Sequence, residues 1–229
     1  MGTDMWTLPE ISHHGEAWHP IADMNQPMKA PRLYPLFALL GDSRNHSGRH
    51  APVWQEPQTV TDADGDVHEI PGWWYKPDDG GHERLNPISE PRGIPEDATV
   101  IWMAFCTIWE MRGASLDITW ITLDDIMNAD WDQIVYSYGV LMEDVYLDLI
   151  ERGITPEQHP LNAGGPGVRV VSEEEYAAGE RGEQITCIDA KWVSGSMREL
   201  HGDFLQVFKA MAEGIPDHSR LRLMLLFES

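Results

Sequence analysis

Stretches of strand character and of helix character alternate irregularly along this chain, and that order limits the folds it can adopt. Apolar runs of strand length occur at Ile118–Ile121, Val168–Val171, Ile185–Val193 and Leu221–Phe227. Helix-period segments lie between them, but not in a regular strand–helix–strand repeat. This mixture predicts the α+β class, a mixed or antiparallel sheet covered by helices. Apolar segments from both ends are needed to complete a sheet, so we expect one domain over residues 1–229.

The segment 44–86 differs in composition from the rest of the chain. It is rich in Gly, Pro, Asp and His, and Thr59–Thr61 and Asp66–Ile70 flank the turn sequence DADG, which predicts a hairpin. We interpret 44–86 as an insertion within the domain. Its aromatic pair Trp73 and Trp74 has two interpretations, a recognition element for a partner or packing in a core.

Two helices carry the residues of most interest. Pro95 followed by Glu96 and Asp97 predicts a helix start, because proline fits the first turn and acids face the positive helix end. Residues 100–109 are apolar nearly all round, so we expect a central buried helix. The second helix, over 142–152, has an apolar face opposite its acids, which are therefore expected to be exposed.

The charge balance defines the partners that the chain can have. It has 16 Lys and Arg against 38 Asp and Glu, a formal net charge of −22. Such a chain repels phosphate backbones and anionic membranes, so we expect basic protein partners and no direct nucleic acid. The longest uncharged stretch, Ala98–Trp109, is too short to span a membrane, and the N-terminus has no secretory signal, so we expect a cytoplasmic protein.

Neither the histidines nor the cysteines predict a cofactor. His13, His14 and His19 lack the spacing of a metal site, and the glycine-rich run at 162–167 lacks the ending of a phosphate loop. Cys106 and Cys187 each lie in an apolar run and are expected to be buried thiols. We therefore expect no metal and no cofactor.

The strongest functional signal is a long segment that carries many acids and no basic residue. No Lys or Arg occurs between Arg112 and Arg152, although nine acids do. One interpretation is a solvated face that keeps the protein soluble. The other is a surface that mimics a phosphate backbone and attracts a basic cleft. On that interpretation the partner-binding residues are Asp124, Asp125, Asp130, Asp132, Asp144, Asp148, Glu151, Glu173, Glu174 and Glu175, with Trp73 and Trp74.

A basic island at 44–50 supports a different hypothesis, an enzyme or small-ligand binder for a phosphate- or carboxylate-bearing substrate. Arg44, Asn45 and Arg92 would hold the anion, because the arginine guanidinium binds such groups with two parallel hydrogen bonds. Asp4 or Glu90 would act as general base. The competing interpretation is that Arg44 and Arg92 are buried structural arginines paired with Asp4, Asp42 or Glu90.

Several segments together resemble a protein family of phages and bacteria. Its members open with MGTDIH, carry the motifs LFAILADVRN and PISEPRGLPEDV, and end like RIVFWFD. The matching segments follow the family's order over nearly the whole chain and comprise Met1–Asp4, Leu36–Asn45, Pro87–Asp97, Trp120–Leu123 with Asp130–Trp131, Gly202–Leu205 and Arg222–Phe227.

The chain departs from that family where histidines would stand. Trp6 replaces the family's first histidine, and Leu116–Thr122 replaces a run like GHSHSWLT. Any metal or acid–base chemistry of those histidines is therefore missing here. The resemblance implies a phage-type accessory protein, and with the charge it favours an interaction protein that binds and inhibits a basic, nucleic-acid-handling host or defence protein. The alternative is the anion-binding enzyme.

Overall fold

The structure is a computed structural model that describes residues 3–12, 17–21, 27–43, 45, 53–61, 65–75, 83–156 and 167–228. The chain divides into two compact units. Unit 1 comprises residues 1–45, 83–135 and 195–229, and unit 2 comprises 46–82 and 136–194. The expected insertion thus groups with a second segment of the chain, and the single domain stays a prediction.

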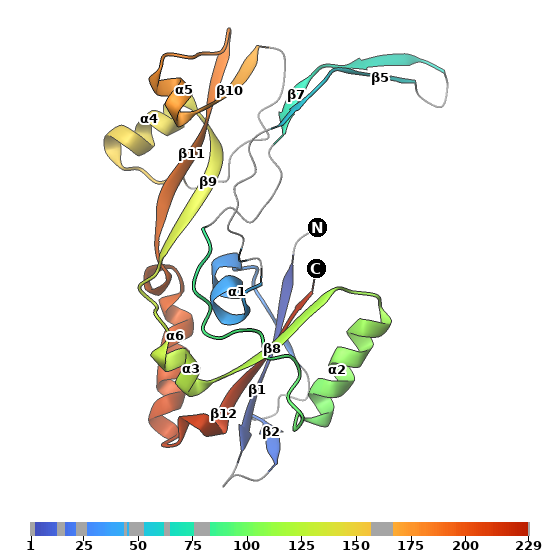
Figure 1. Ribbon diagram of the computed structural model, residues 1–229, viewed down its shortest axis with the longest axis vertical. Helices are drawn as coiled ribbons and strands as arrows, with labels where there is room; N and C mark the ends of the chain where they lie inside the picture. The colour runs from blue at the N-terminus through green and yellow to red at the C-terminus, as the bar shows by residue number, and fades with distance from the viewer. Residues whose placement is uncertain are drawn as a thin grey trace. The chain divides into compact units, whose positions relative to one another are not determined.

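A five-stranded sheet organises unit 1 (Figure 1). β12 (Leu221–Glu228) lies between β1 (Asp4–Ser12) and β8 (Leu116–Thr122) and is antiparallel to both. The short strands β2 (Trp18–Pro20) and β3 (Met28–Ala30) pair with β1 on its other edge. The first and last described segments thus complete one sheet, which confirms the expectation from the apolar chain ends.

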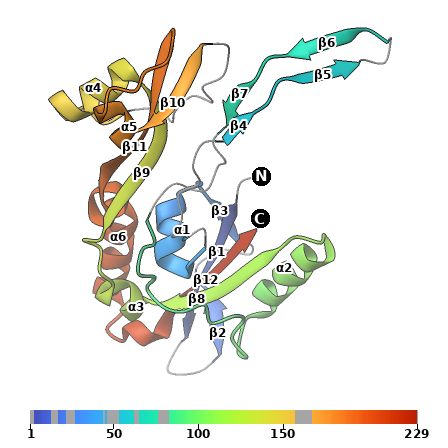
Figure 2. The same ribbon diagram turned by 45° about the horizontal axis from the view of Figure 1, so that its top comes forward.

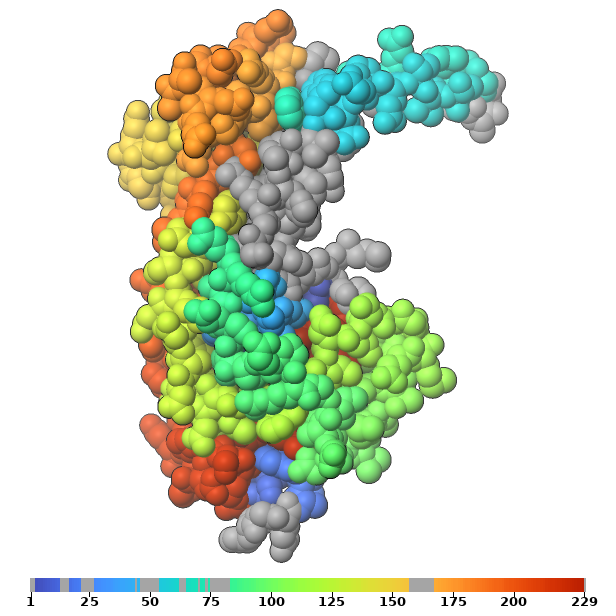
Figure 3. All heavy atoms as spheres, in the orientation of Figure 1, coloured from blue at the N-terminus to red at the C-terminus, as the bar shows by residue number. Residues whose placement is uncertain are grey.

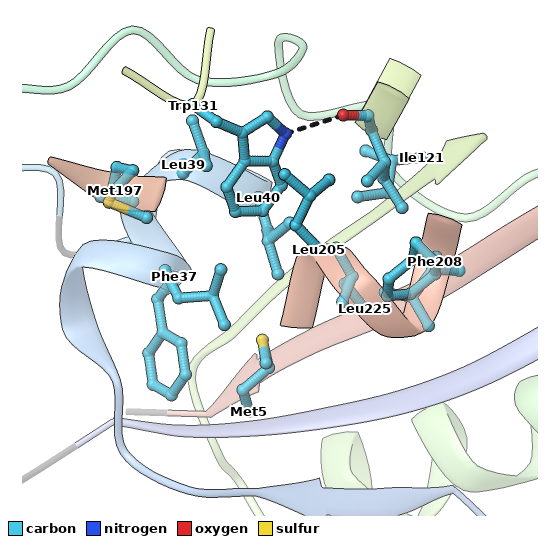
Figure 4. Close-up of a cluster of buried hydrophobic side chains, with 14 of the residues drawn as sticks. Met5, Phe37, Leu39, Leu40, Ile121, Trp131, Met197, Leu205, Phe208 and Leu225 are labelled. Carbon is cyan, nitrogen blue, oxygen red and sulfur yellow. Dashed lines mark hydrogen bonds between the residues drawn. The ribbon is translucent and has the colours of Figure 1, made fainter. Parts of the chain in front are cut away.

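Helices cover both faces of this sheet (Figures 1 and 2). α1 (Tyr34–Gly41), α3 (Leu123–Asn128) and α6 (Met197–Gly214) pack on one face, and α2 (Val100–Met111) on the other. A 3-10 turn at His218–Arg220 leads into β12. Figure 4 shows the core between the sheet and α1, α3 and α6. In this core the Trp131 indole N–H donates to the carbonyl of Ile126 at 2.8 Å.

The period of two along β12 separates the two cores of unit 1. Leu223 and Leu225 belong to the core with α1, α3 and α6, whereas Met224 and Leu226 belong to the core with α2. All four are buried, as expected for a central strand covered on both faces. Because Arg222 alternates in step with Met224, its side chain is on the α2 face.

Four helices begin directly where a strand ends, and three of them carry a capping box. A Ser or Thr side chain accepts a hydrogen bond from the backbone three residues on, and the acid there accepts one in return from the cap residue. These capping boxes pair Thr122 with Asp125 at α3, and Ser196 with Glu199 at α6. The third pairs Ser172 with Glu175 at the start of α5 (Glu173–Ala177) in unit 2. Part of the acidic character of the chain therefore serves helix initiation.

The sheet of unit 2 has β11 (Ile185–Ser196) between β10 (Val168–Ser172) and β9 (Ile134–Met142). β10 and β11 are parallel. α4 (Glu143–Arg152) and α5 (Glu173–Ala177) follow β9 and β10 without a loop. Their core comprises Leu141, Tyr146, Val171, Ile188, Ala190 and Trp192.

Two small ribbons complete unit 2. β5 (Gln58–Thr61) pairs with β6 (Val67–Ile70), which confirms the predicted hairpin, and β4 (Val53–Gln55) pairs with β7 (Trp73–Tyr75). The α+β class is confirmed by this combination of antiparallel and mixed sheets with helices. Within the described ranges, no helix is both long and apolar enough to cross a membrane.

A buried ion pair joins the sheet of unit 1 to the start of α2. Arg222 and Glu10 are cross-strand neighbours on β12 and β1, and their side chains are 1% and 0% exposed. The Arg222 Nε donates to Glu10 Oε2 at 2.8 Å, and its Nη1 to Asp97 Oδ1 at 2.6 Å. Thr99, the N-cap of α2, donates its hydroxyl to Glu10 Oε1 at 2.5 Å. The charges are thus paired rather than merely buried.

Aromatic contact completes this cluster. The guanidinium of Arg222 lies 4.0 Å from the centre of the Trp18 ring, and the Trp18 indole N–H donates to Asp97 Oδ2 at 2.7 Å. Burial acts to raise the pKa of Asp97, but hydrogen bonds from Arg222 and Trp18 outweigh it and lower that pKa. The cluster therefore fixes β2, α2 and two central strands with one cation.

Replacing one partner of this pair should destabilise the protein more than replacing both. Arg222→Met leaves the Glu10 carboxylate buried without its cation, which costs about 3–5 kcal/mol in the free energy of unfolding. Glu10→Leu with Arg222→Met removes both charges, and we expect it to recover a large part of that loss. Urea unfolding followed by circular dichroism measures both. A double variant as unstable as the sum of the single variants would contradict this prediction.

Candidate partner-binding surface

The arginine proposed for anion binding already has a carboxylate partner. Arg92 donates to Asp125 with two nitrogens, at 2.7 and 3.2 Å, and its guanidinium lies 4.8 Å from the centre of the Trp120 ring. The same Asp125 caps α3 through the backbone N–H of Thr122. The structure thus places Arg92 in the pairing expected of a structural arginine, although with Asp125 rather than with Glu90.

The other candidates for an enzymatic site also have local partners. Asp4 accepts from Lys29 at 2.5 Å and from Arg32 at 2.7 Å, and the hydrogen bonds from Arg32 and Lys29 lower its pKa. Asn45 binds the backbone of Leu85 through both its amide oxygen and its amide nitrogen. Glu90 is exposed. Arg44 and the rest of the basic island lie outside the described residues, so the anion site stays a prediction without support from the described geometry.

Two of the four candidate acids of unit 1 are paired with an arginine. Asp132 receives two hydrogen bonds from Arg198, the shorter at 2.7 Å, and these lower its pKa. Asp124 lies 3.3 Å from the Nδ1 of His218. Asp130 accepts a hydrogen bond from the backbone N–H of Asp132 and is exposed. Asp125 is bound to Arg92, so Asp124 and Asp130 are the acids of this set without an arginine partner in the described contacts.

The candidate acids of unit 2 are brought together by two reciprocal Tyr–Glu hydrogen bonds between α4 and α5, which we call the Tyr–Glu exchange. The Tyr146 hydroxyl on α4 donates to Glu173 on α5 at 3.2 Å, and the Tyr176 hydroxyl on α5 donates to Glu143 on α4 at 2.7 Å. The two rings meet edge to face, with centroids 5.3 Å apart. Each helix thus contributes the same pair, an acid at its first residue and a tyrosine three residues later.

This exchange gathers the first turns of both helices into one acidic cluster. The cluster comprises Glu143, Asp144, Glu173, Glu174 and Glu175. Arg181 is the cation that the described contacts place there, with its Nε 3.2 Å from Glu143 and its guanidinium 3.7 Å from the centre of the Tyr176 ring. Asp144 and Glu174 are exposed and accept no side-chain cation in the described contacts.

Two further candidate acids lie later on α4. Asp148 forms an ion pair with Arg152 one turn on, and Glu151 is exposed. Helix N-termini attract carboxylates, so part of the acidic cluster stabilises α4 and α5 themselves. Glu175, which completes the capping box with Ser172, belongs to that part, and the backbone hydrogen bond from Ser172 lowers its pKa. Asp144, Glu151 and Glu174 remain the carboxylates most available to a partner.

The aromatic candidates lie at the base of the ribbons in unit 2. Trp74 packs against Val140, Val170 and Cys187, as the core interpretation expected. Trp54, opposite it on β4, has its ring centroid 5.5 Å from that of Trp74. Trp73 is on β7, and its side chain lies outside the described atoms.

Neither thiol is a candidate nucleophile. Cys106 and Cys187 are buried, as expected, and burial raises the pKa of Cys106 to about 12. In the described part of the chain, no group of His, Cys, Asp and Glu side chains is arranged to hold a metal ion. His13 and His14 lie outside the described residues, whereas His19 on β2 is exposed.

Comparison of the chain with family models, curated proteins and solved structures gives no match. The resemblance to a phage and bacterial family therefore stays an expectation from the sequence motifs.

The Asp125–Arg92 pair predicts a defined loss of stability in acid. Burial acts to raise the pKa of Asp125, but hydrogen bonds from Arg92 and Thr122 lower it below its ordinary 3.8. The folded pKa is thus below the unfolded one, so the pair's contribution is complete above about pH 3.8 and is lost as pH falls through the folded pKa. Asp125→Asn should lower the melting temperature at neutral pH, and the difference from wild type should shrink in strong acid.

Asp130→Asn is the matched control, because Asp130 has no ion-pair partner in the described contacts. Its melting temperature should follow that of the wild type across the same pH range. A constant difference between Asp125→Asn and wild type at every pH would contradict the assignment of the acid-sensitive stability to this pair.

Tyr146 and Tyr176 should lose their hydroxyl protons at a higher pH than an ordinary tyrosine. Burial and then Glu173 raise the pKa of Tyr146, and the hydrogen bond to Glu143 raises the pKa of Tyr176, both above the ordinary 10. Their contribution is present below pH 10 and is lost as pH rises through the folded values. Glu143→Gln should bring the Tyr176 pKa closer to 10, measured by tyrosinate absorbance. Tyr136→Phe, outside the cluster, should leave both late titrations in place.

Proposed function

We propose that this chain is an interaction protein that binds a basic protein through the acidic cluster of unit 2. The observation that carries the proposal is the reciprocal Tyr–Glu exchange, which joins two acidic helix starts into one surface. In unit 1, Asp125 and Asp132 are each paired with an arginine. In unit 2 the fold instead concentrates carboxylates from segments about 30 residues apart.

The chemistry of this surface favours a partner that handles nucleic acid. Such proteins present clefts rich in Lys and Arg, whose fields extend over about a Debye length, roughly 10 Å at 0.1 M salt. Carboxylates at two adjacent helix N-termini offer closely spaced negative charges, which such a cleft binds. The net charge of −22 adds long-range attraction for the same partner. The resemblance to phage proteins supports a host or defence protein as the target, and inhibition by occupation of the cleft as the result.

A capture experiment tests this function. Tagged wild-type protein is incubated with bacterial lysate at low salt, and the retained proteins are identified by mass spectrometry. We expect a basic nucleic-acid-handling protein that is released as salt rises towards about 1 M, where the Debye length falls to roughly 3 Å. Added duplex DNA should displace it as well, because both ligands would compete for one basic cleft.

Matched variants separate the cluster from charge in general. Asp144→Asn with Glu174→Gln removes two exposed carboxylates of the cluster and should reduce capture several-fold. Asp203→Asn with Glu213→Gln removes the same charge from exposed positions of α6 and should leave capture unchanged. Equal capture by both double variants would show that only net charge matters. A partner retained despite excess duplex DNA would contradict nucleic-acid mimicry.

A further inference from the structure

The outward face of α2 in unit 1 is apolar and has no covering element among the described residues. The expectation of a central buried helix is wrong, because only Trp102 and Cys106 of this helix are buried. Val100 is 84% exposed and Met111 83%, with Ile108 at 49% and Met103 at 43%. A surface helix ordinarily places polar residues on its outer side.

These residues form one continuous stripe. Positions three and four apart share a helix face, and the exposed members recur at that spacing from the first residue of α2 to its last. They are Val100, Met103, Ala104, Thr107, Ile108 and Met111. The opposite side packs on the sheet through Trp102 and Cys106. Figure 3 shows the green atoms of the segment that contains α2 on the outside of unit 1.

The helix is held firmly enough to present this stripe. Its N-cap Thr99 is hydrogen-bonded to the buried Glu10, and Asp97 just before it is bound to Arg222. On the inner side, Phe105 and Trp109 contact the Trp6 ring at centroid distances of 5.3 and 5.6 Å. The exposed apolar side chains are therefore a fixed surface of the fold and not a frayed end.

The surrounding charge identifies the occupant. From residue 93 to residue 111 the chain has no Lys or Arg, and its charged residues there are Glu96, Asp97 and Glu110. Glu96 and Glu110 are exposed at the two ends of the stripe. Arg112, the C-cap residue of α2, lies over the Trp109 ring, 4.9 Å from its centre, and Arg222 is bound to Asp97. An apolar stripe with acidic ends fits a partner whose own apolar stripe is flanked by Lys or Arg.

We propose that the α2 stripe docks an amphipathic basic segment of a partner protein, with apolar side chains against Met103, Ile108 and Met111 and cations near Glu96 and Glu110. A second copy of this chain would bring like charges together, and an anionic membrane would repel them. Methionine side chains adapt to the shape of what they contact, which suits them to such a surface. The proposal concerns unit 1, so it does not depend on the acidic cluster of unit 2.

A synthetic peptide tests the proposal directly. The probe is a fluorescein-labelled helical peptide with leucines at every third and fourth position and lysines elsewhere, titrated with wild-type protein by fluorescence anisotropy. We expect saturable binding that Met103→Gln with Met111→Gln weakens at least tenfold. These substitutions keep side-chain length and helix propensity at exposed positions, so the melting temperature should not change. The same peptide with glutamates in place of the lysines should not bind.

Controls assign the binding to the correct surface. Val207→Gln changes a similarly exposed residue of α6, 54% exposed, and should leave the peptide affinity unchanged. Asp144→Asn with Glu174→Gln should also leave it unchanged if the peptide binds α2. Loss of affinity in that acidic variant, together with full affinity in the methionine variant, would overturn the proposal and assign the peptide to unit 2.

Two other occupants would overturn the proposal as well. Sedimentation equilibrium tests for a second copy, and a dimer that is lost in the methionine variant would identify one. Flotation with vesicles of phosphatidylglycerol tests for a membrane, and binding that the methionine variant loses would identify a lipid surface. We expect a monomer that does not float with these vesicles.

Discussion

The buried contact between Arg222 and Glu10 is the constraint on which the organisation of unit 1 depends. A carboxylate and a guanidinium that are almost fully buried are tolerated only if each finds its counter-charge and its hydrogen bonds. Here the requirement is met by groups from four separate parts of the chain, since Trp18, Asp97 and Thr99 join the pair. The register of β1 against β12 and the position of α2 must therefore be correct together. Because the desolvation of a buried ion pair can cost as much as the pairing gains, the cluster is evidence for this arrangement rather than for added net stability.

That fixed position explains how an apolar helix face can remain exposed. Both sides of this helix carry apolar side chains, so its composition does not by itself decide which side faces the sheet. The hydrogen bonds of Asp97 and Thr99 determine where α2 begins and therefore which residues face the sheet. Trp102 and Cys106 then lie inside, and Val100 and Met111 lie outside. The exposed stripe is thus a consequence of the buried polar cluster on the same face of the sheet.

The local elements of this fold were predictable from sequence, whereas the pairings between distant residues were not. The hairpin at 58–70, the capping box of Thr122 and the helix ended by Gly153 follow from signals a few residues long. β9 was missed, because Gly and Ser interrupt its apolar pattern. The α2 prediction failed for a related reason, since an all-apolar sequence gives no indication of which side is covered. No local signal pairs Glu10 with Arg222, its buried partner 212 positions away.

The acidic residues illustrate the same limit at the level of function. Their number is plain in the sequence, but their roles differ, because Asp125 and Asp132 are bound to arginines and Glu175 caps a helix. Only the exchange between Tyr146 and Tyr176 and their acidic partners shows which carboxylates gather on one surface. The binding proposed for this surface depends on charge and should weaken with salt, whereas the apolar part of the contact proposed for the α2 stripe should persist. The two proposed surfaces can therefore be distinguished by their response to salt.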